Sequence, residues 1–192
     1  MRLFVALVPP EDALEELAEF LRPRQEAEPA FRWTAPEQWH VTLAFMAEVA
    51  ERHVDDLSER LARAARRRTP FQLGLRGGGA FPGVARAKVL YAGVDAGTAG
   101  EELRRLSVGA RAAAAKAGAP PDGGRFHAHV TLARLRAPAD VSRWVRVLDS
   151  YRGAVWVADE ISLIRSYLGE GPRRRPRYDV VDTFPVGPSP AS

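Results

Sequence analysis

The sequence contains no cysteine, only two lysines, and no long apolar run. The absence of cysteine excludes disulfides, cysteine nucleophiles, thiolate zinc sites and iron–sulfur clusters. A membrane helix needs about 18 consecutive apolar residues, and no run approaches that length. The N-terminal residues 1–10 are too short for a secretory segment with a cleavage site and are typical of a first strand. We therefore expect a cytoplasmic protein without a membrane span.

Because lysine is so rare, nearly all of the 28 basic residues are arginines, set against 24 acidic residues for a net charge of +4. Arginine suits bidentate recognition of phosphate. A compositional bias towards arginine, alanine, glycine and proline explains the same count, so the charge permits an anionic ligand without demonstrating one. The 192 residues, 46% of them hydrophobic, are enough for one well-packed domain spanning residues 1–192.

The apolar pattern alternates between helical and strand-like periodicity. Spacings of three and four predict amphipathic helices over residues 14–21, 54–64, 103–113 and 141–148. Runs rich in β-branched and aromatic residues predict strands at 2–8, 40–46, 71–75, 87–94, 128–134, 154–165 and 178–184. Gly77–Gly79 is expected to form a hairpin loop and residues 185–192 a frayed tail. Because turns rather than helices join several strands, the pattern favours an α+β fold with antiparallel pairing.

A pentapeptide occurs twice. His40–Ala44 reads HVTLA, and His129–Ala133 repeats it 89 residues later. An echo at close to half the chain length indicates an internal duplication. In a strand, alternate side chains share a face, so the histidine and threonine of each copy point to one side and the valine and leucine to the other. If a pseudo-two-fold axis relates the two halves, both polar pairs converge in one cleft.

Two histidines and two hydroxyls in one cleft suit the cleavage of a cyclic phosphodiester. One histidine takes a proton from water and the other gives a proton to the leaving oxygen. Thr42 and Thr131 can donate hydrogen bonds to the non-bridging phosphate oxygens, although threonine is also an ordinary strand residue. This chemistry needs no metal, and by itself it does not say which histidine is the acid.

The paired His-x-Thr-x motifs resemble those of the 2H phosphoesterase superfamily, and most closely its RNA 2′,3′-cyclic phosphodiesterases, also called 2′-5′ RNA ligase-like proteins. The resemblance extends to Arg2–Leu7, Phe31–Trp33, Phe126–Arg134, Ile164–Ser166 and Tyr178–Val180. Ala47 stands where the family usually has glycine, and Ala128 where it often has proline.

The resemblance implies a bilobal duplicated fold, with two antiparallel sheets flanking a central cleft and helices on the outside. It implies that His40 is the proton donor to the leaving 3′ oxygen, that His129 is the proton acceptor from water, and that the product is a 2′-phosphate. The expected partners are RNA ends or nucleotides with a 2′,3′-cyclic phosphate. No cofactor and no metal are expected, and the duplication accounts for a two-lobed monomer without a partner chain.

Arg134 is a further candidate for binding the phosphate. Five residues beyond His129, it has the opposite strand parity, so it reaches the cleft only if the strand ends or bulges near Ala133. Arg173–Arg177 forms a basic loop that is either a solvated turn or a contact for an RNA backbone. Three aromatic residues could fill the core or stack on a nucleobase, namely Trp33, Phe45 and Tyr91.

Alternatives to hydrolysis remain open at this point. The chain could bind RNA ends without turnover, catalyse 2′-5′ ligation, or hydrolyse another cyclic phosphate such as one on ADP-ribose. His127 and His129 share a strand face and could hold a metal, but the sequence offers few further ligands nearby. Specificity among the cyclic phosphates lies in loops that the motifs do not describe.

Overall fold

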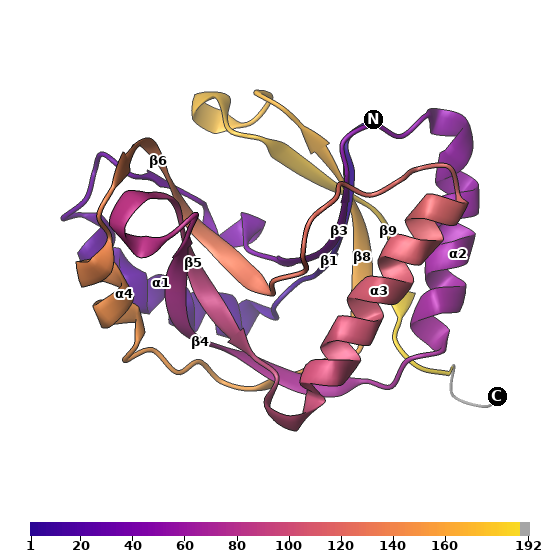
Figure 1. Ribbon diagram of the computed structural model, residues 1–192, viewed down its shortest axis with the longest axis horizontal. Coiled ribbons are helices and arrows are strands. Elements are labelled where there is room, and N and C mark those ends of the chain that lie inside the picture. The colour runs from indigo at the N-terminus through magenta and orange to yellow at the C-terminus, as the bar shows by residue number, and fades with distance from the viewer. Residues whose placement is uncertain (189–192) are drawn as a thin grey trace.

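The structure, a computed structural model, describes residues 1–188. These residues form two antiparallel sheets and four α-helices (Figure 1). The first sheet has the order β3-β1-β8-β9, with β1 at Leu3–Leu7, β3 at Val41–Met46, β8 at Glu160–Tyr167 and β9 at Arg177–Pro185. The second has the order β2-β6-β5-β4-β7, with β2 at Arg32–Trp33, β4 at Phe71–Phe81, β5 at Ala87–Asp95, β6 at His129–Ala139 and β7 at Trp156–Ala158. The α+β class with two antiparallel sheets is confirmed.

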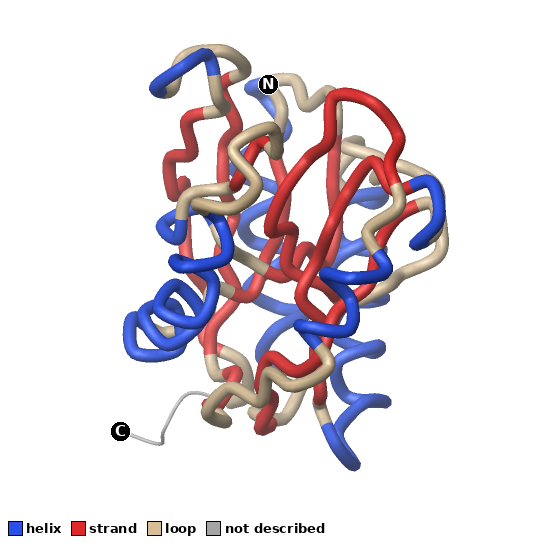
Figure 2. Tube along the Cα trace, turned by 90° about the vertical axis from the view of Figure 1, so that its left-hand side faces the viewer, coloured by secondary structure: helices blue, strands red, loops and turns tan. Residues whose placement is uncertain are grey.

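Two helices lie beside each sheet. In each pair, one helix follows a strand of the opposite sheet in the chain order. The helices are α1 (Glu11–Gln25), α2 (Val54–Arg66), α3 (Gly100–Lys116) and α4 (Ser142–Leu148). Helix α1 follows a strand of the first sheet but lies with α4 beside the second sheet, whereas α3 follows a strand of the second sheet and packs with α2 on the first (Figure 1). The view turned by 90° shows helices to either side of the strands (Figure 2).

The duplication extends well beyond the pentapeptide. Helix α1 begins at Glu11 and α3 at Gly100, and β4 begins at Phe71 and β8 at Glu160, each pair 89 residues apart. The order β1-α1-β3-α2-β4 in the first half therefore matches β5-α3-β6-α4-β8 in the second. This is the register of the two histidines, so the repeat in sequence is a repeat of whole elements.

The core is continuous between the lobes. One cluster of buried apolar side chains includes Leu43 of the first motif and Leu132 of the second, both at most 1% exposed. The buried hydroxyl of Ser107 on α3 donates a hydrogen bond of 2.7 Å to the Leu43 carbonyl oxygen. This bond ties α3, which follows a strand of the second sheet, to β3 of the first. The strands that carry the histidines are thus held from behind by close packing.

The prediction of a hairpin loop at Gly77–Gly79 is wrong, because β4 continues through these residues without turning. The register between β4 and β5 shifts between Leu75 and Gly78, and Gly77 has a φ of 63° that favours glycine. A Cβ at Gly78 would overlap Leu148, and one at Gly79 would overlap Tyr91. These glycines therefore serve a bulge and close packing inside a strand.

Two other expectations need correction. The single strand expected at 154–165 is two strands, because the chain leaves the second sheet after Ala158 and enters the first at Glu160. The tail expected to fray from residue 185 is held at its start: Val186 is buried and its N–H donates to the Asp159 carbonyl oxygen. Residues 189–192 lie outside the described residues.

Candidate active site

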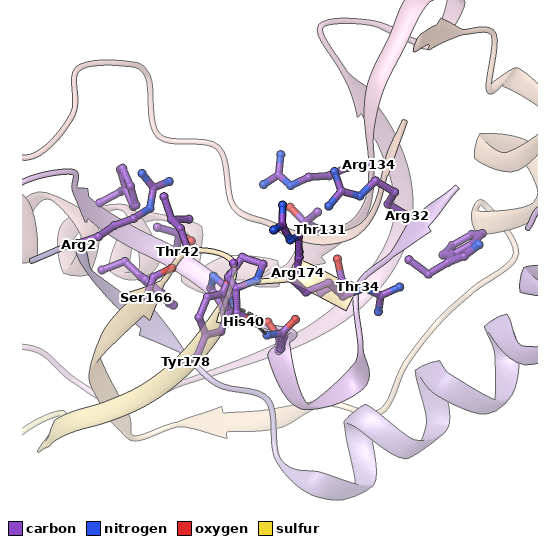
Figure 3. Close-up of a pocket in the computed structure, with 18 of the residues that line it drawn as sticks. Arg2, Arg32, Thr34, His40, Thr42, Thr131, Arg134, Ser166, Arg174 and Tyr178 are labelled. Atoms are coloured by element: carbon purple, nitrogen blue, oxygen red, sulfur yellow. Dashed lines mark hydrogen bonds between the residues drawn. The ribbon is translucent and has the colours of Figure 1, made fainter. Parts of the chain in front are cut away.

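A cleft of about 690 Å³ lies between the two sheets and brings the two motifs together (Figure 3). His40 and Thr42 line it from the start of β3, and His129 and Thr131 line it from β6. Arg134 lines it as well. The two histidines and two threonines thus share one cavity, as the duplication predicts, and Arg134 lies in the same cavity.

Both motif strands bulge at the same place. On β3, Thr42 pairs with Ala6 and Ala44 with Val5, so Leu43 is the extra residue. On β6, Thr131 pairs with Tyr91 and Ala133 with Leu90, so Leu132 is the extra residue. Each bulge places two successive side chains in the core and reverses the alternation beyond it.

The reversal explains how Arg134 reaches the cleft. Leu132 and Ala133 are both fully buried, and the next side chain returns to the face of the histidine. Because β2 pairs with β6 here, the Thr34 N–H donates to the Leu132 carbonyl oxygen, so the bulge keeps a hydrogen-bond partner. In a regular strand Arg134 would face away from His129, and the bulge turns it to the same side.

The two histidines make matching hydrogen bonds. Nδ1 of His40 lies 2.7 Å from the Gln38 carbonyl oxygen, and Nδ1 of His129 lies 2.7 Å from the His127 carbonyl oxygen. A carbonyl oxygen only accepts hydrogen bonds, so Nδ1 carries the proton in each ring. In the neutral rings this leaves Nε2 unprotonated and free to accept a proton.

Aromatic rings pack against both imidazoles. The Phe4 ring stacks on His40 with centroids 4.5 Å apart, and Tyr178 meets it edge-on at 5.6 Å. His129 lies 4.9 Å from Phe81 and 5.4 Å from Tyr91 between ring centroids. These contacts fix the orientation of each ring and remove water from it.

Desolvation keeps both rings neutral. Burial lowers the pKa of His40 to about 4, against the hydrogen bond to Gln38; the charge of Arg134, and that of His129 when it is protonated, lower it further by smaller amounts. Burial also lowers the pKa of His129, and Arg134 acts in the same direction. In the ligand-free cleft, both histidines are therefore bases at neutral pH.

The cleft is lined by groups of positive charge. Five arginines line it, namely Arg2, Arg32, Arg134, Arg174 and Arg175, and within residues 1–188 no aspartate or glutamate does. Figure 3 shows Arg32 and Arg134 side by side, with Arg2 beyond Thr42. The arrangement suits an anionic ligand that accepts hydrogen bonds on several sides.

Several lining residues escaped the sequence reasoning. Arg2, Ser166 and Tyr178 come from segments noted only as strands, and Thr34 comes from the segment before the first motif. The sequence relates Arg2 to the site only indirectly, through Phe45, the residue that matches Arg134 in the repeat. In the structure, the Arg2 guanidinium lies 4.3 Å from the centroid of the Phe45 ring. Of the three aromatics considered for base stacking, Trp33 and Phe45 line the cleft, whereas Tyr91 packs on Phe81.

The metal alternative finds little support in the placement of side chains. His127 and His129 have ring centroids 6.1 Å apart, and one ring bonds the backbone of the other residue. Across the described part of the chain, no group of three or more histidines and carboxylates is placed to hold a metal ion.

None of the described helices is long and apolar enough to cross a membrane.

Comparison with known proteins decides the family. The model for LigT-like phosphoesterases matches residues 7–91 and 94–173. The chain belongs to the LigT-like phosphoesterase family. This confirms the resemblance drawn from the two motifs and the expectation that the chain is an enzyme.

Individual members of the LigT-like family are similar over nearly the whole chain. A protein of Thermus thermophilus named RNA 2′,3′-cyclic phosphodiesterase is 33% identical, over 96% of this chain and 89% of its own. The crystal structure of TT0787 from Thermus thermophilus is 30% identical with a TM-score of 0.76, covering 98% of this chain and 99% of that one. Escherichia coli LigT complexed with 3′-AMP is 26% identical with a TM-score of 0.72, covering 96% of each chain.

Proposed function

We propose that this chain hydrolyses 2′,3′-cyclic phosphate ends of RNA or nucleotides to 2′-phosphates without a metal. The observation that carries the proposal is the matched pair of histidines, each bonded through Nδ1 to the carbonyl two residues earlier. The name of the Thermus thermophilus relative, RNA 2′,3′-cyclic phosphodiesterase, supports the same substrate class.

The reaction needs one proton acceptor and one proton donor on opposite sides of phosphorus. His129 accepts the proton of the attacking water through Nε2 as the new phosphorus–oxygen bond forms. His40, protonated at Nε2, gives its proton to the 3′ oxygen as the bond from phosphorus to that oxygen breaks. The product carries a 2′-phosphate and a 3′-hydroxyl. The assignment of the two roles follows the resemblance of the two motif regions to the family.

Substrate binding prepares His40 for its role as donor. The positive charge of Arg134 contributes to the lowered pKa of both histidines. A bound phosphate diester brings a negative charge that offsets this field and raises the pKa of the imidazoles. A ring that is neutral in the empty cleft thus takes up a proton together with the substrate.

The remaining groups act on the phosphate oxygens. The hydroxyls of Thr42 and Thr131 flank the two histidines and donate hydrogen bonds to the non-bridging oxygens, where charge grows in the transition state. Arg134 adds a planar guanidinium with several N–H donors. Side chains therefore supply acid, base and charge stabilisation.

The test is an assay of RNA bearing a 2′,3′-cyclic phosphate in excess EDTA, with the 2′- and 3′-phosphate products resolved. The proposal predicts turnover to the 2′-phosphate alone. Binding of the RNA with no turnover would overturn it in favour of a binding role. Activity lost in EDTA and restored by zinc would overturn the metal-independent mechanism.

A further inference from the structure

The catalytic cleft continues into a second hollow that the chemistry above does not use. This hollow, the arginine groove, has a volume of about 520 Å³. Four arginines line it, namely Arg32, Arg136, Arg173 and Arg175. They come from β2, from the far half of β6, and from the turn between β8 and β9.

The two hollows share side chains. Arg32 and Arg175 line both, and Arg174, which lies between two groove residues in sequence, lines the cleft. On β6, Arg134 faces the cleft and Arg136 faces the groove. Two residues of strand advance the chain by about 7 Å, so the positive charge continues outward in short steps.

The charge of the groove is uncompensated. Among residues 1–188, no acidic residue lines it and no ion pair involves any of its four arginines. Arg177, on the same hairpin, is by contrast paired with both Glu170 and Asp179. Moreover, Arg32 and Arg134 lie directly opposite each other in the β2–β6 ladder, where like charges destabilise the pairing.

The turn that presents Arg173 is held in an unfavourable conformation. Arg173 and Arg174 have φ values of 55° and 59°, in the left-handed region that residues other than glycine rarely adopt. The Gly171 N–H donates a hydrogen bond to the Arg175 carbonyl oxygen within the turn. The side-chain amide of Gln38, just before β3, donates to the Pro176 carbonyl oxygen and so fixes the turn to that segment. Such strain persists where the surroundings impose it, and it collects at ligand sites.

We infer that the arginine groove binds the sugar–phosphate backbone of the RNA strand that ends in the cyclic phosphate. This inference rests on the proposed function. A cyclic phosphate uses the 2′ and 3′ oxygens of the last nucleotide, so the strand leaves the cleft only through the 5′ oxygen. The next phosphates of that strand are anions that need cations beyond the cleft, and the groove supplies them. The preferred substrate is therefore an oligoribonucleotide rather than a mononucleotide.

The experiment compares kcat/KM for a 2′,3′-cyclic mononucleotide and for a tetraribonucleotide with the same end. The variant is Arg136→Ala/Arg173→Ala, because these two residues line the groove and not the cleft. The matched control, Arg63→Ala/Arg67→Ala, removes two arginines from α2 and its C-terminal end.

Wild type is expected to favour the tetranucleotide by tenfold or more. The groove variant loses most of this advantage while its mononucleotide kcat/KM stays unchanged, and the control variant keeps it. Because each phosphate contact on a single strand contributes about 0.7 to the logarithmic salt slope, the variant's slope for the tetranucleotide falls by about 1.4. Equal advantages in wild type and groove variant, or no advantage in wild type, would overturn the inference.

Failure of the proposed function is seen separately, as no turnover of either substrate. In that case, fluorescence anisotropy with a labelled tetranucleotide bearing a 3′-phosphate still tests the groove. The groove variant should then bind at least fivefold more weakly than the control variant. Equal binding by both variants would overturn the inference.

Discussion

Phe45 and Arg134 occupy the same position in the two halves of the chain, five residues beyond His40 and His129. Both follow a one-residue bulge, and both line the cleft. Arg134 brings its own guanidinium, whereas the Phe45 ring lies under the guanidinium of Arg2. Each half thus contributes one arginine to the cleft, one directly and one held by an aromatic contact.

The first prediction concerns Arg134. Replacing Arg134 with Gln removes a charge-assisted contact to the phosphate, so kcat/KM should fall about 100-fold. Arg134→Lys should recover only part of this loss, because an ammonium cannot make the bidentate contact. Steady-state kinetics on a 2′,3′-cyclic nucleotide measures both, with Arg63→Gln on α2 as the control. An Arg134→Gln variant within a few-fold of wild type would rule out the contact.

The second prediction concerns the pH dependence of the rate. Burial lowers the pKa of both histidines, to about 4 for His40, so the inflections of kcat/KM should lie below the ordinary value of about 6.5. The anionic substrate raises the pKa of His40, so the alkaline inflection of kcat should lie at higher pH than that of kcat/KM. Inflections of kcat/KM that both lie above pH 7 would contradict the burial argument.

The third prediction concerns the pH dependence of stability. A histidine whose pKa is about 4 when folded and about 6.5 when unfolded binds more protons in the unfolded state. Its contribution to stability is therefore complete above pH 6.5 and is lost as the pH falls towards 4, by at most about 3 kcal/mol.

Urea unfolding at pH 7 and at pH 4.5 measures this loss. The difference between the two pH values should be smaller in His40→Ala than in wild type, whatever the absolute stability of the variant. His53→Ala, which changes a histidine outside the cleft, serves as the control variant. Identical pH dependence in wild type and His40→Ala would show that His40 is not desolvated.

The fourth prediction concerns the threonines. Thr42→Val and Thr131→Val keep the shape and β-propensity of the side chain but remove the hydroxyl donor. Each should lower kcat about 10- to 100-fold, with a smaller change in KM, because the hydrogen bond strengthens as charge develops on the phosphate. Thr98→Val, at an exposed position before α3, serves as the control. A change confined to KM would indicate ground-state binding only.

Much of the fold could be predicted from the sequence because local patterns agree with it. The apolar spacing around Leu57 and Leu61 marks α2, and both side chains are fully buried. The repeat of His40–Ala44 at His129–Ala133 was enough to predict one shared cleft, because alternation along a strand fixes which side chains face together.

The rest depends on contacts between segments far apart in sequence. The glycines at 77–79 predict a turn locally, but they lie in a strand, where Gly78 and Gly79 leave room only for Leu148 and Tyr91. Neither bulge has a local signal: the one at Leu132 was visible only as a question about the parity of Arg134, and the one at Leu43 was not predicted. Likewise, β2 is two residues long, and its pairing with β6 places Arg32 at the cleft by tertiary contact alone.

The measurement that tests the central claim most directly is a mutant cycle on the two histidines. His40→Ala, His129→Ala and the double variant are assayed with RNA bearing a 2′,3′-cyclic phosphate, after circular dichroism has shown that each is folded. If the two rings act together as acid and base, each single variant should lose about 10²- to 10⁴-fold in kcat. The double variant should then lose little more than either single one, because the partners act as a unit. A folded single variant that keeps activity within a few-fold of wild type would contradict the account.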